Sequence, residues 1–434
     1  MNKYIKLLVV SSFILVSYAA SGFELSANLY SDVSYHSNVA LQSDSAEEDV
    51  SQTFGLLVQL EENRKRFNAD ASFNLTEEHY YNDTFANQTS LTTGFGVFNF
   101  DIIENFLNWR TSYTRTQVLQ NAFDADTPDN REDRDILRSG PSISYRLSRE
   151  SSVSLSANYT NVENSDIQAS DTERVNGAIN YNYLLNSTTS FSLSSQYDEM
   201  IDGEGADELK STDVSIGFVR QISHGELSFN FGRTLTRSDI SDDVEGDFYD
   251  LSFSRREILF HDVVIQYRQD LTDTSIGFES DEEGFETGLG AESNEQFVGV
   301  ATTLDILNRK RLNLRLSRGI NTFQYTFSGF WGDDDFRIQS QDSHTSGFGL
   351  SLNQNLTHDI TAGLTYRFTF DDFFEQSEIG KEKRAIYRFD LSYRFSPDLV
   401  VKGDVGFNSR ENSQNKIREY EDFGVNLGFD WTIY

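Results

Sequence analysis

The sequence predicts an all-β fold, a transmembrane antiparallel up-and-down β-barrel of about 20 strands, within a range of roughly 16 to 22. Three observations predict it: an export signal at the N-terminus, apolar residues that alternate with polar ones, and connections that alternate between long and short. A soluble β-sandwich has no reason to keep such a loop pattern along its whole chain. The combination therefore favours strands that cross a lipid bilayer.

The N-terminus has the order of a signal peptide. Lys3 and Lys6 form a short positive head, Leu7–Val16 is mostly apolar, and small residues follow at Ala19–Gly22. The apolar run is about ten residues long, whereas a membrane-spanning helix needs roughly 20. We therefore expect residues 1–22 to be a signal peptide cleaved between Ala19 and Phe23, and residues 23–434 to form the mature barrel. No later stretch reads as a membrane-spanning helix.

Alternation with a period of two follows the signal peptide, and this is the period of a β-strand. Each run is about 9–12 residues long, which crosses a bilayer at the usual barrel tilt. The apolar members of the clearest runs are Leu25, Ala27, Leu29, Val33 and Tyr35; Phe67, Ala69, Ala71, Phe73 and Leu75; Val153, Leu155, Ala157 and Tyr159; Leu312, Leu314 and Leu316; and Ile360, Ala362, Leu364, Tyr366, Phe368 and Phe370.

The connections give the topology, because outer-membrane barrels have long loops outside and short turns in the periplasm. The predicted long loops are Ala40–Asp49, Val118–Asp135, Asn161–Glu173, Asp198–Lys210, Arg237–Gly246, Asp270–Glu295 and Asp371–Lys383. The predicted short turns are Ser148–Ser151, Leu185–Thr188, Ser223–Gly225, Asn308–Lys310, Thr357–Asp359 and Ser396–Asp398. An even number of strands then places both termini at the periplasmic side.

Charge follows the same division in this interpretation. The long loops are acidic, as at Asp281–Glu283 and Asp333–Asp335, and the short turns are richer in base, as at Arg64–Arg66, Arg255–Arg256 and Arg309–Arg311. Solvation of the loop tips is the preferred interpretation of their acidity.

Composition excludes several other classes. The formal net charge of −33 argues against nucleic acid as a partner, because the chain would repel phosphates. The aromatic content of 13% argues against disorder. With no cysteine, the chain forms no disulfide, thiolate metal site or lipidated cysteine.

The last strand ends on a pattern that resembles the C-terminal signal read by the barrel-assembly machinery. Asn426, Gly428, Trp431 and Ile433 fit it, one residue before the terminal Tyr434. The assembly machinery is therefore an expected partner.

The sequence contains no catalytic motif, and we expect no enzyme activity and no cofactor. The six histidines are scattered without metal-ligand spacing. The acidic residues Asp124, Asp126, Asp129, Glu132 and Asp133 suggest calcium, but they lack the spacing of a calcium-binding hand loop. Solvated surface is the preferred interpretation there.

Two features of the C-terminal strands carry functional hypotheses. Alternation predicts that Arg315, Arg367, Arg388, Asp390, Arg394 and Lys402 line the lumen, together with Arg311, Asp404 and Asp430. These residues form either a charge-balanced ladder that rigidifies the wall or a basic stripe that guides an anionic solute or polymer. Within Gly319–Ser343, the rings of Phe323, Tyr325, Phe327, Phe330 and Trp331 either stack on sugars or belong to an interfacial aromatic girdle.

Short motifs connect the chain to a known group. Tyr35-His36-Ser37-Asn38-Val39 follows the first strand, Arg66-Phe67 opens the third, and Tyr80-Tyr81-Asn82 closes it. In these features the chain resembles the outer-membrane β-barrel family associated with exopolysaccharide and PEP-CTERM sorting loci. The export signal and the barrel pattern predict location in the outer membrane of a Gram-negative bacterium, with lipid and lipopolysaccharide as partners. The resemblance implies a context of surface polysaccharide, which is a further expected partner.

The expected function is a channel or accessory barrel for export of surface polysaccharide. Two alternatives stay open: a structural or surface-interaction barrel with a closed lumen, and a general diffusion porin.

Overall fold

One antiparallel sheet of 20 strands accounts for nearly all of the regular structure. The computed structural model describes residues 23–119, 125, 127–165, 171–202, 208–239, 242–258, 260–273, 306–337, 342–373 and 380–433. The signal peptide expected at residues 1–22 and the acidic segment Asp281–Glu283 lie outside these ranges, so both remain predictions.

The strands are 13 to 16 residues long and follow one another along the chain. They are β1 (Glu24–His36), β2 (Asp49–Arg64), β3 (Phe67–Tyr80), β4 (Gln88–Ile103), β5 (Leu107–Leu119), β6 (Arg131–Arg146), β7 (Ser151–Asn164), β8 (Thr172–Asn186), β9 (Thr189–Asp202), β10 (Glu208–Ile222), β11 (Gly225–Ser238), β12 (Val244–Ile258), β13 (His261–Asp273), β14 (Ile306–Ile320), β15 (Phe323–Phe336), β16 (Ser343–Asn355), β17 (Ile360–Phe373), β18 (Lys381–Ser396), β19 (Leu399–Asn412) and β20 (Tyr420–Ile433). Short 3-10 turns occur at Pro128–Asn130 and Lys416–Arg418.

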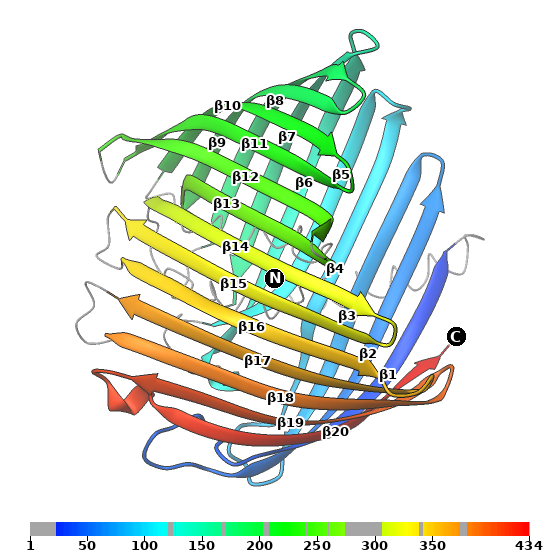
Figure 1. Cartoon of the computed structure of the whole chain (residues 1–434), viewed down its shortest axis with the longest axis vertical. Coiled ribbons are helices and arrows are strands. Elements are labelled where there is room, and N and C mark those ends of the chain that lie inside the picture. Colours follow the sequence, from blue (N-terminus) through cyan, green and yellow to red (C-terminus); the bar gives the residue numbers. More distant parts are fainter. Residues whose placement is uncertain are drawn as a thin grey trace.

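The sheet closes on itself. Each strand pairs antiparallel with the next, and β1 also pairs with β20, from Ala27 opposite Ile433 to His36 opposite Gly424. Figure 1 shows the end of β20 beside β1. The predicted fold class and strand number are confirmed. Closure leaves no sheet edge with unpaired backbone groups, which is the condition for a sheet to cross a bilayer.

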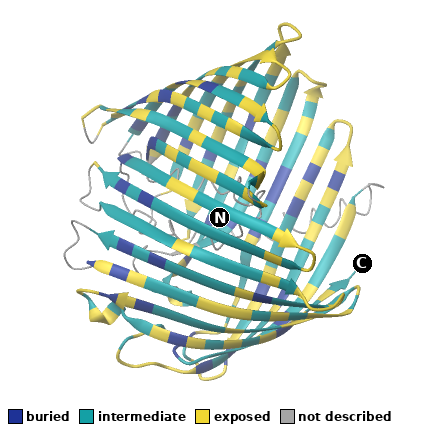
Figure 2. Ribbon diagram, viewed as in Figure 1, coloured by how far each residue is buried: buried dark blue, intermediate teal, exposed yellow. Residues whose placement is uncertain are grey.

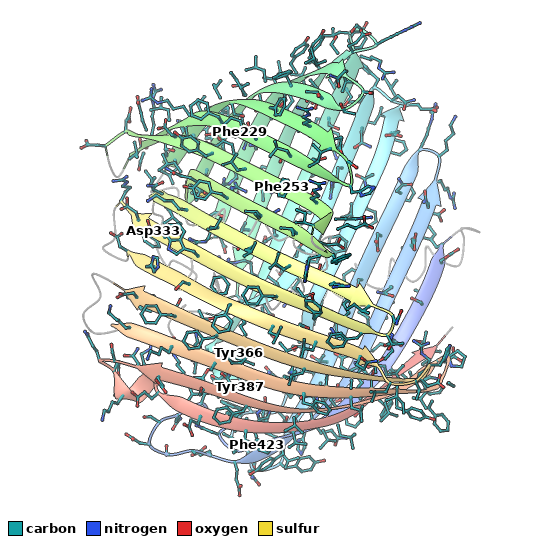
Figure 3. The ribbon with its side chains drawn as sticks, in the orientation of Figure 1. Phe229, Phe253, Asp333, Tyr366, Tyr387 and Phe423 are labelled. Atoms are coloured by element: carbon teal, nitrogen blue, oxygen red, sulfur yellow. The ribbon has the colours of Figure 1, made fainter. Side chains whose placement is uncertain are left out.

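The register separates an apolar face from a polar one in every strand. On β17, Leu364, Tyr366 and Phe368 share a face, and Thr365 and Arg367 share the other. The large apolar side chains are exposed, and Figure 3 shows Tyr366 and Tyr387 on the outside of the wall. Exposed and covered positions alternate along the strands in Figure 2. The apolar face is therefore the lipid face, and the polar face lines the lumen.

Aromatic rings form a continuous row across the lipid face of β16 to β19. Ring centroids lie 5.6 Å apart for Phe348 and Tyr366, 4.7 Å for Tyr366 and Tyr387, and 6.3 Å for Tyr387 and Phe407. The buried apolar residues are few by comparison. Met200, Leu209, Leu271 and Ile306 form the main buried cluster of the described residues, with Val244 packed against it.

The connections form two classes, here called the turn end and the loop end of the barrel. Short connections join β6 to β7, β8 to β9, β10 to β11, β16 to β17 and β18 to β19, where five of the six short turns were predicted. Both Ala27 and Ile433 lie toward the turn end. Among the described residues, no helix combines the length and apolar character needed to span a membrane.

The sixth predicted turn is wrong. Asn308–Lys310 lies inside β14, and the turn that joins β14 to β15 is at Asn321 and Thr322. The predicted acidic loop Asp333–Asp335 is likewise part of β15. These two segments face each other in the sheet, with Arg309 opposite Asp334 and Lys310 opposite Asp333. Opposite charges keep the polar segments paired beyond the apolar belt, so Arg309–Arg311 is a loop-end feature.

The strands are also longer than the predicted 9–12 residues, for the same reason. Charged residues beyond the apolar belt continue the backbone pairing. For example, β5 ends only at Leu119 and β6 already begins at Arg131, so the loop between them is shorter than the predicted Val118–Asp135. Most of the predicted loop Asp270–Glu295 lies outside the described residues, while Asp270 to Asp273 belong to β13.

The assignment of faces makes a direct prediction at two neighbouring residues of β16. Leu350→Arg places a charge against lipid and should destabilise the barrel by about 2–4 kcal/mol, whereas Ser351→Arg points into the lumen and should cost under about 1 kcal/mol. Urea unfolding of both variants in lipid vesicles measures this. Equal costs, or a larger cost for Ser351→Arg, would reverse the two faces.

Candidate functional site: the charged lumen wall

The lumen face carries charge in four sectors. The first acidic sector is formed by β20 and β1 to β3, where the described inner-face side chains include no Lys or Arg. Its acids are Asp422, Asp430, Glu24, Asp32, Asp49, Glu61, Asp70 and Glu78. Three of these, Glu24, Glu61 and Asp70, lie directly opposite one another on adjacent strands near the turn end.

With the sectors numbered in strand order, the second basic sector spans β14 to β19, and basic residues outnumber acidic ones there. The bases are Arg309, Arg311, Arg315, Arg367, Arg384, Arg388, Arg394, Lys402 and Arg410, and the acids are Asp334, Asp371, Glu382, Asp390 and Asp404. This wall contains the lumen residues that the sequence singled out, except Asp430, which lies on β20 in the first acidic sector.

The remaining strands repeat the alternation. Inner-face bases dominate in the first basic sector, β4 to β8, with Arg110, Arg134, Arg138, Arg146 and Arg174 against Asp101 and Glu132. Acids dominate again in the second acidic sector, β9 to β13, with Asp198, Asp213, Glu226, Asp250, Asp262 and Asp270 against Arg268. Like sectors face each other across the barrel in the strand order, and each sector borders two of opposite charge.

The predicted lumen residues are not isolated charges. Arg388 Nε lies 3.8 Å from Asp404 Oδ2, and Lys402 Nζ lies 2.6 Å from Asp430 Oδ2. Asp390 lies opposite Asp404 in the register and leans over β17, where a Cβ on Gly363 would be 2.3 Å from its Oδ1.

The other three predicted residues also lie on the polar face. The guanidinium of Arg367 lies 6.0 Å from the ring centroid of Phe330 on the same inner face. Arg315 is opposite Val264 and Ser328. Arg394 is exposed near the turn end, opposite Val400. The register thus places all six side chains on the polar face, and their role stays a prediction.

A belt of ion pairs, each with a buried carboxylate, lies nearer the loop end, and sequence reasoning missed it. Its pairs are Arg174–Asp198 at 2.5 Å, Arg311–Asp334 at 2.6 Å, Arg410–Glu382 at 2.7 Å and Arg384–Asp371 at 3.0 Å. Glu382 is only 2% exposed. Breaking a buried pair leaves an uncompensated charge, so these pairs stabilise the wall. Extending the period-two rule past the apolar belt would have placed these side chains on the inner face, but it would not have identified their partners on other strands.

The lumen wall therefore has two levels. The loop-end pairs have buried carboxylates, whereas the side chains of Arg388 and Lys402, closer to the turn end, are 52% and 51% exposed. Exposed charges on a polar wall are the ones available to a passing solute.

The aromatic segment of β15 is divided between the two faces. Phe323, Tyr325, Phe327 and Trp331 point to the lipid side, as an interfacial girdle requires. Phe330 points into the lumen opposite Asn313 and Gly347. The five rings therefore form no single surface for stacking sugars.

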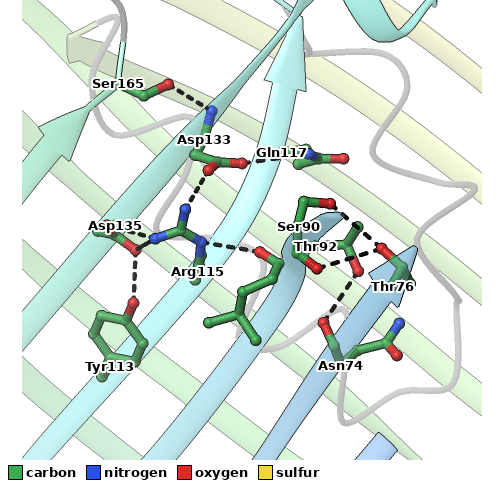
Figure 4. A network of polar contacts seen from close by, with 11 residues as sticks. Asn74, Thr76, Ser90, Thr92, Tyr113, Arg115, Gln117, Asp133, Asp135 and Ser165 are labelled. Atoms are coloured by element: carbon green, nitrogen blue, oxygen red, sulfur yellow. Dashed lines mark hydrogen bonds and ion pairs between the residues drawn. The ribbon is translucent and has the colours of Figure 1, made fainter. Parts of the chain in front are cut away.

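In the acidic cluster that suggests calcium, the structure pairs Asp133 with an arginine. Asp124 and Asp126 lie outside the described residues. Asp133 forms an ion pair with Arg115, whose Nη1 also lies 3.0 Å from Asp135, and Tyr113 donates a hydrogen bond to Asp135 (Figure 4). This network lies on the lipid-side face near the loop end. Among the described residues, no group of three or more acidic or histidine side chains is arranged to hold a metal ion.

The residues of the C-terminal pattern lie at the seam between β20 and β1. Trp431 and Ile433 face lipid. Asn426 points inward, accepts a hydrogen bond from Ser34 Oγ at 3.2 Å and donates one to Asp404 at 3.4 Å. Gly428 leaves room for Asp32, since a Cβ there would be 1.8 Å from Asp32 Oδ1.

Comparison with known proteins agrees with this geometry. No family model and no curated protein matches the chain. The fold is similar to that of the FrpB iron transporter from Neisseria meningitidis. For the F5-1 variant apoprotein the TM-score is 0.51 at 10% identity, covering 95% of this chain and 82% of that one. For the F3-3 variant the TM-score is 0.50 at 10% identity, with 97% and 83% covered. For OpdQ from Pseudomonas aeruginosa the TM-score is 0.44 at 9% identity, and the match covers 95% of this chain and 99% of OpdQ.

At this identity the likeness to FrpB shows the fold. Together with the apolar belt and the closed sheet, it makes the chain a large β-barrel of the kind found in Gram-negative outer membranes.

Removing residues 428–434 tests whether the C-terminal pattern is needed for assembly. The deletion takes away the partners of Asp32 through Ala27 in β1, so the sheet cannot close along that stretch. We expect no heat-modifiable barrel in the outer membrane and accumulation of unfolded chain, measured by gel mobility with and without heating. Normal levels of folded barrel would show that the match to the assembly signal is coincidental.

Proposed function

We propose that the chain is an outer-membrane channel without catalytic activity, in which the second basic sector guides an anionic solute. The supporting observation is the excess of base over acid on the inner face of β14 to β19. Arg388 and Lys402 keep about half of their side-chain surface exposed on that wall.

The electrostatic argument concerns where an anion can pass. A charged solute inside a barrel loses part of its hydration, and fixed opposite charges on the wall offset that loss. The acidic sectors repel an anion, and the basic sectors attract it. An anion is therefore expected to follow β14 to β19 or the smaller basic sector opposite.

For the solute class we propose an acidic extracellular polysaccharide. A linear polyanion carries charges at regular spacing and suits a wall on which bases recur along neighbouring strands. The resemblance of Tyr35–Val39 and its companion motifs to barrels of exopolysaccharide loci supports the same class. The description of FrpB as an iron transporter does not carry over, because the two chains share only a fold at 10% identity.

A structural barrel with a closed lumen is the second candidate. The belt of ion pairs near the loop end favours it. Glu382 and Arg410 are only 2% and 6% exposed, so these inner-face charges are covered by protein and not open to water in the lumen. In this alternative the loops contact surface polymer and nothing passes through. The basic wall would then act only as the ladder considered from the sequence.

Replacing Arg367, Arg388 and Arg394 with Gln distinguishes a wall that guides anions from a charge ladder that only stabilises the barrel. If the wall guides anions, the triple variant should fold normally and its reversal potential in a planar bilayer with a salt gradient should shift toward cation selectivity. The control replaces Arg233, Arg237 and Lys310, which lie on the outer face near the loop end, with Gln and should leave the reversal potential unchanged. Lower thermal stability with unaltered selectivity would favour the ladder, and an unconductive wild type would reject the channel.

A second experiment tests the polysaccharide. Acidic oligosaccharides added to the bilayer chamber should interrupt the wild-type current more often than neutral oligosaccharides of the same length, and the triple variant should lose this difference. Equal effects of both sugars would leave a channel without preference for polyanions.

A further inference from the structure

The seam between β1 and β20 has a special problem of closure. Every other pair of neighbouring strands is consecutive in the chain and joined by its own connection, whereas β1 and β20 lie at opposite ends of the chain. Bringing such distant residues together carries the largest loop-closure entropy of any pair in the sheet. The backbone ladder from Ala27 to His36 must hold this seam without a connection.

A cluster of side chains forms hydrogen bonds across the seam at its loop end. The carboxylate of Asp422 in β20 accepts hydrogen bonds from three consecutive residues that end β1 and follow it. His36 Nδ1 lies 2.7 Å from Oδ2, the backbone N–H of Asn38 lies 3.0 Å from Oδ1, and Ser37 Oγ lies 3.4 Å from Oδ1. His36 and Asp422 are 386 residues apart in sequence.

Further bonds tie the same two segments in both directions. The backbone N–H of Phe423 donates to Ser37 Oγ at 2.8 Å, and the N–H of Ser37 donates to the Phe423 carbonyl at 3.0 Å. Asn38 Nδ2 donates to the Glu421 carbonyl at 3.2 Å and to the Gln42 carbonyl at 2.8 Å, and its Oδ1 accepts from Gln42 N–H at 3.0 Å.

Two members of the cluster are buried, and the two strands approach closely there. Asn38 is 2% exposed and Asp422 is 6% exposed. The ring of His36 lies over Gly424, where a Cβ would be 3.0 Å from His36 Cε1. Because glycine has no side chain, the imidazole ring fits against the backbone of β20. Hydrogen bonds to a buried charged group are stronger than those between neutral groups.

We propose that His36, Ser37, Asn38 and Asp422 form a latch that fastens the last strand to the first and keeps the barrel closed. The backbone ladder aligns the two strands, and the latch fixes their loop end through side chains. This assigns a role to Tyr35–Val39, the motif that the lumen does not use. The latch does not depend on the proposed channel function, because it acts on the wall and not on a solute.

The Asp422→Asn variant tests the latch with minimal change of shape. An amide has one acceptor oxygen in place of two, so it cannot serve all three donors. The matched control is Asp198→Asn, because Asp198 is also 6% exposed and pairs with Arg174 on β8, a strand joined to β9 by a short turn. Both variants should open at a lower temperature than the wild type in a heat-modifiability assay, by at least a few degrees.

Disulfide rescue distinguishes seam opening from general destabilisation. The chain has no cysteine, so Val33→Cys with Leu427→Cys, which lie opposite each other, introduces a single bond across the seam. This disulfide should restore most of the loss in Asp422→Asn and little of the loss in Asp198→Asn. The control disulfide Leu193→Cys with Ile216→Cys, between β9 and β10, should not rescue Asp422→Asn.

The proposal is overturned if Asp422→Asn opens at the wild-type temperature, or if both disulfides rescue it equally. If Asp422→Asn yields no folded barrel, the milder Ser37→Ala variant takes its place, since it removes only one hydroxyl from the cluster. Wild-type behaviour of Ser37→Ala, with no response to the seam disulfide, would then reject the latch.

Discussion

The lipid bilayer offers no hydrogen-bond partner to a peptide group, and this constraint governs the whole molecule. Every strand must find a neighbour on both sides, so the sheet of 20 strands closes through β1 and β20. Closure then fixes the meaning of each residue position, because an antiparallel barrel with a period of two has one face toward lipid and one toward the lumen. The apolar and aromatic side chains occupy the first face, and the charged ones the second.

Within the lumen, charge is sorted along the circumference as well as by face. Acidic and basic sectors alternate, and they meet at pairs such as Lys402 with Asp430, which joins the second basic sector to the first acidic one at 2.6 Å. Such pairs stabilise the wall locally, while the uneven charge within each sector leaves a field across the lumen. Near the loop end the same chemistry is buried, as in Glu382 with Arg410. One wall thus combines a structural level and an exposed level.

Sequence alone predicted the barrel, its strand number and the polar face of Arg367, Arg388 and Lys402, because period two is a local property. It misplaced Asn308–Lys310 and Asp333–Asp335, since three consecutive charges resemble a turn until their partners on the neighbouring strand are known. It also missed the belt around Glu382 and the cluster around Asp422. Each of those sites joins residues on different strands, and His36 and Asp422 are 386 residues apart in the sequence. No local pattern specifies such a pairing.

The division of each strand between lipid and lumen is the central claim, and a spin-label scan tests it most directly. The chain has no cysteine, so single cysteines at positions 364 to 369 of β17 can each carry a label in reconstituted vesicles. We predict high accessibility to oxygen at Leu364, Tyr366 and Phe368, and high accessibility to a water-soluble nickel chelate or low accessibility to both reagents at Thr365, Arg367 and Thr369. Uniform accessibility, or a period near that of a helix, would contradict the structure described here.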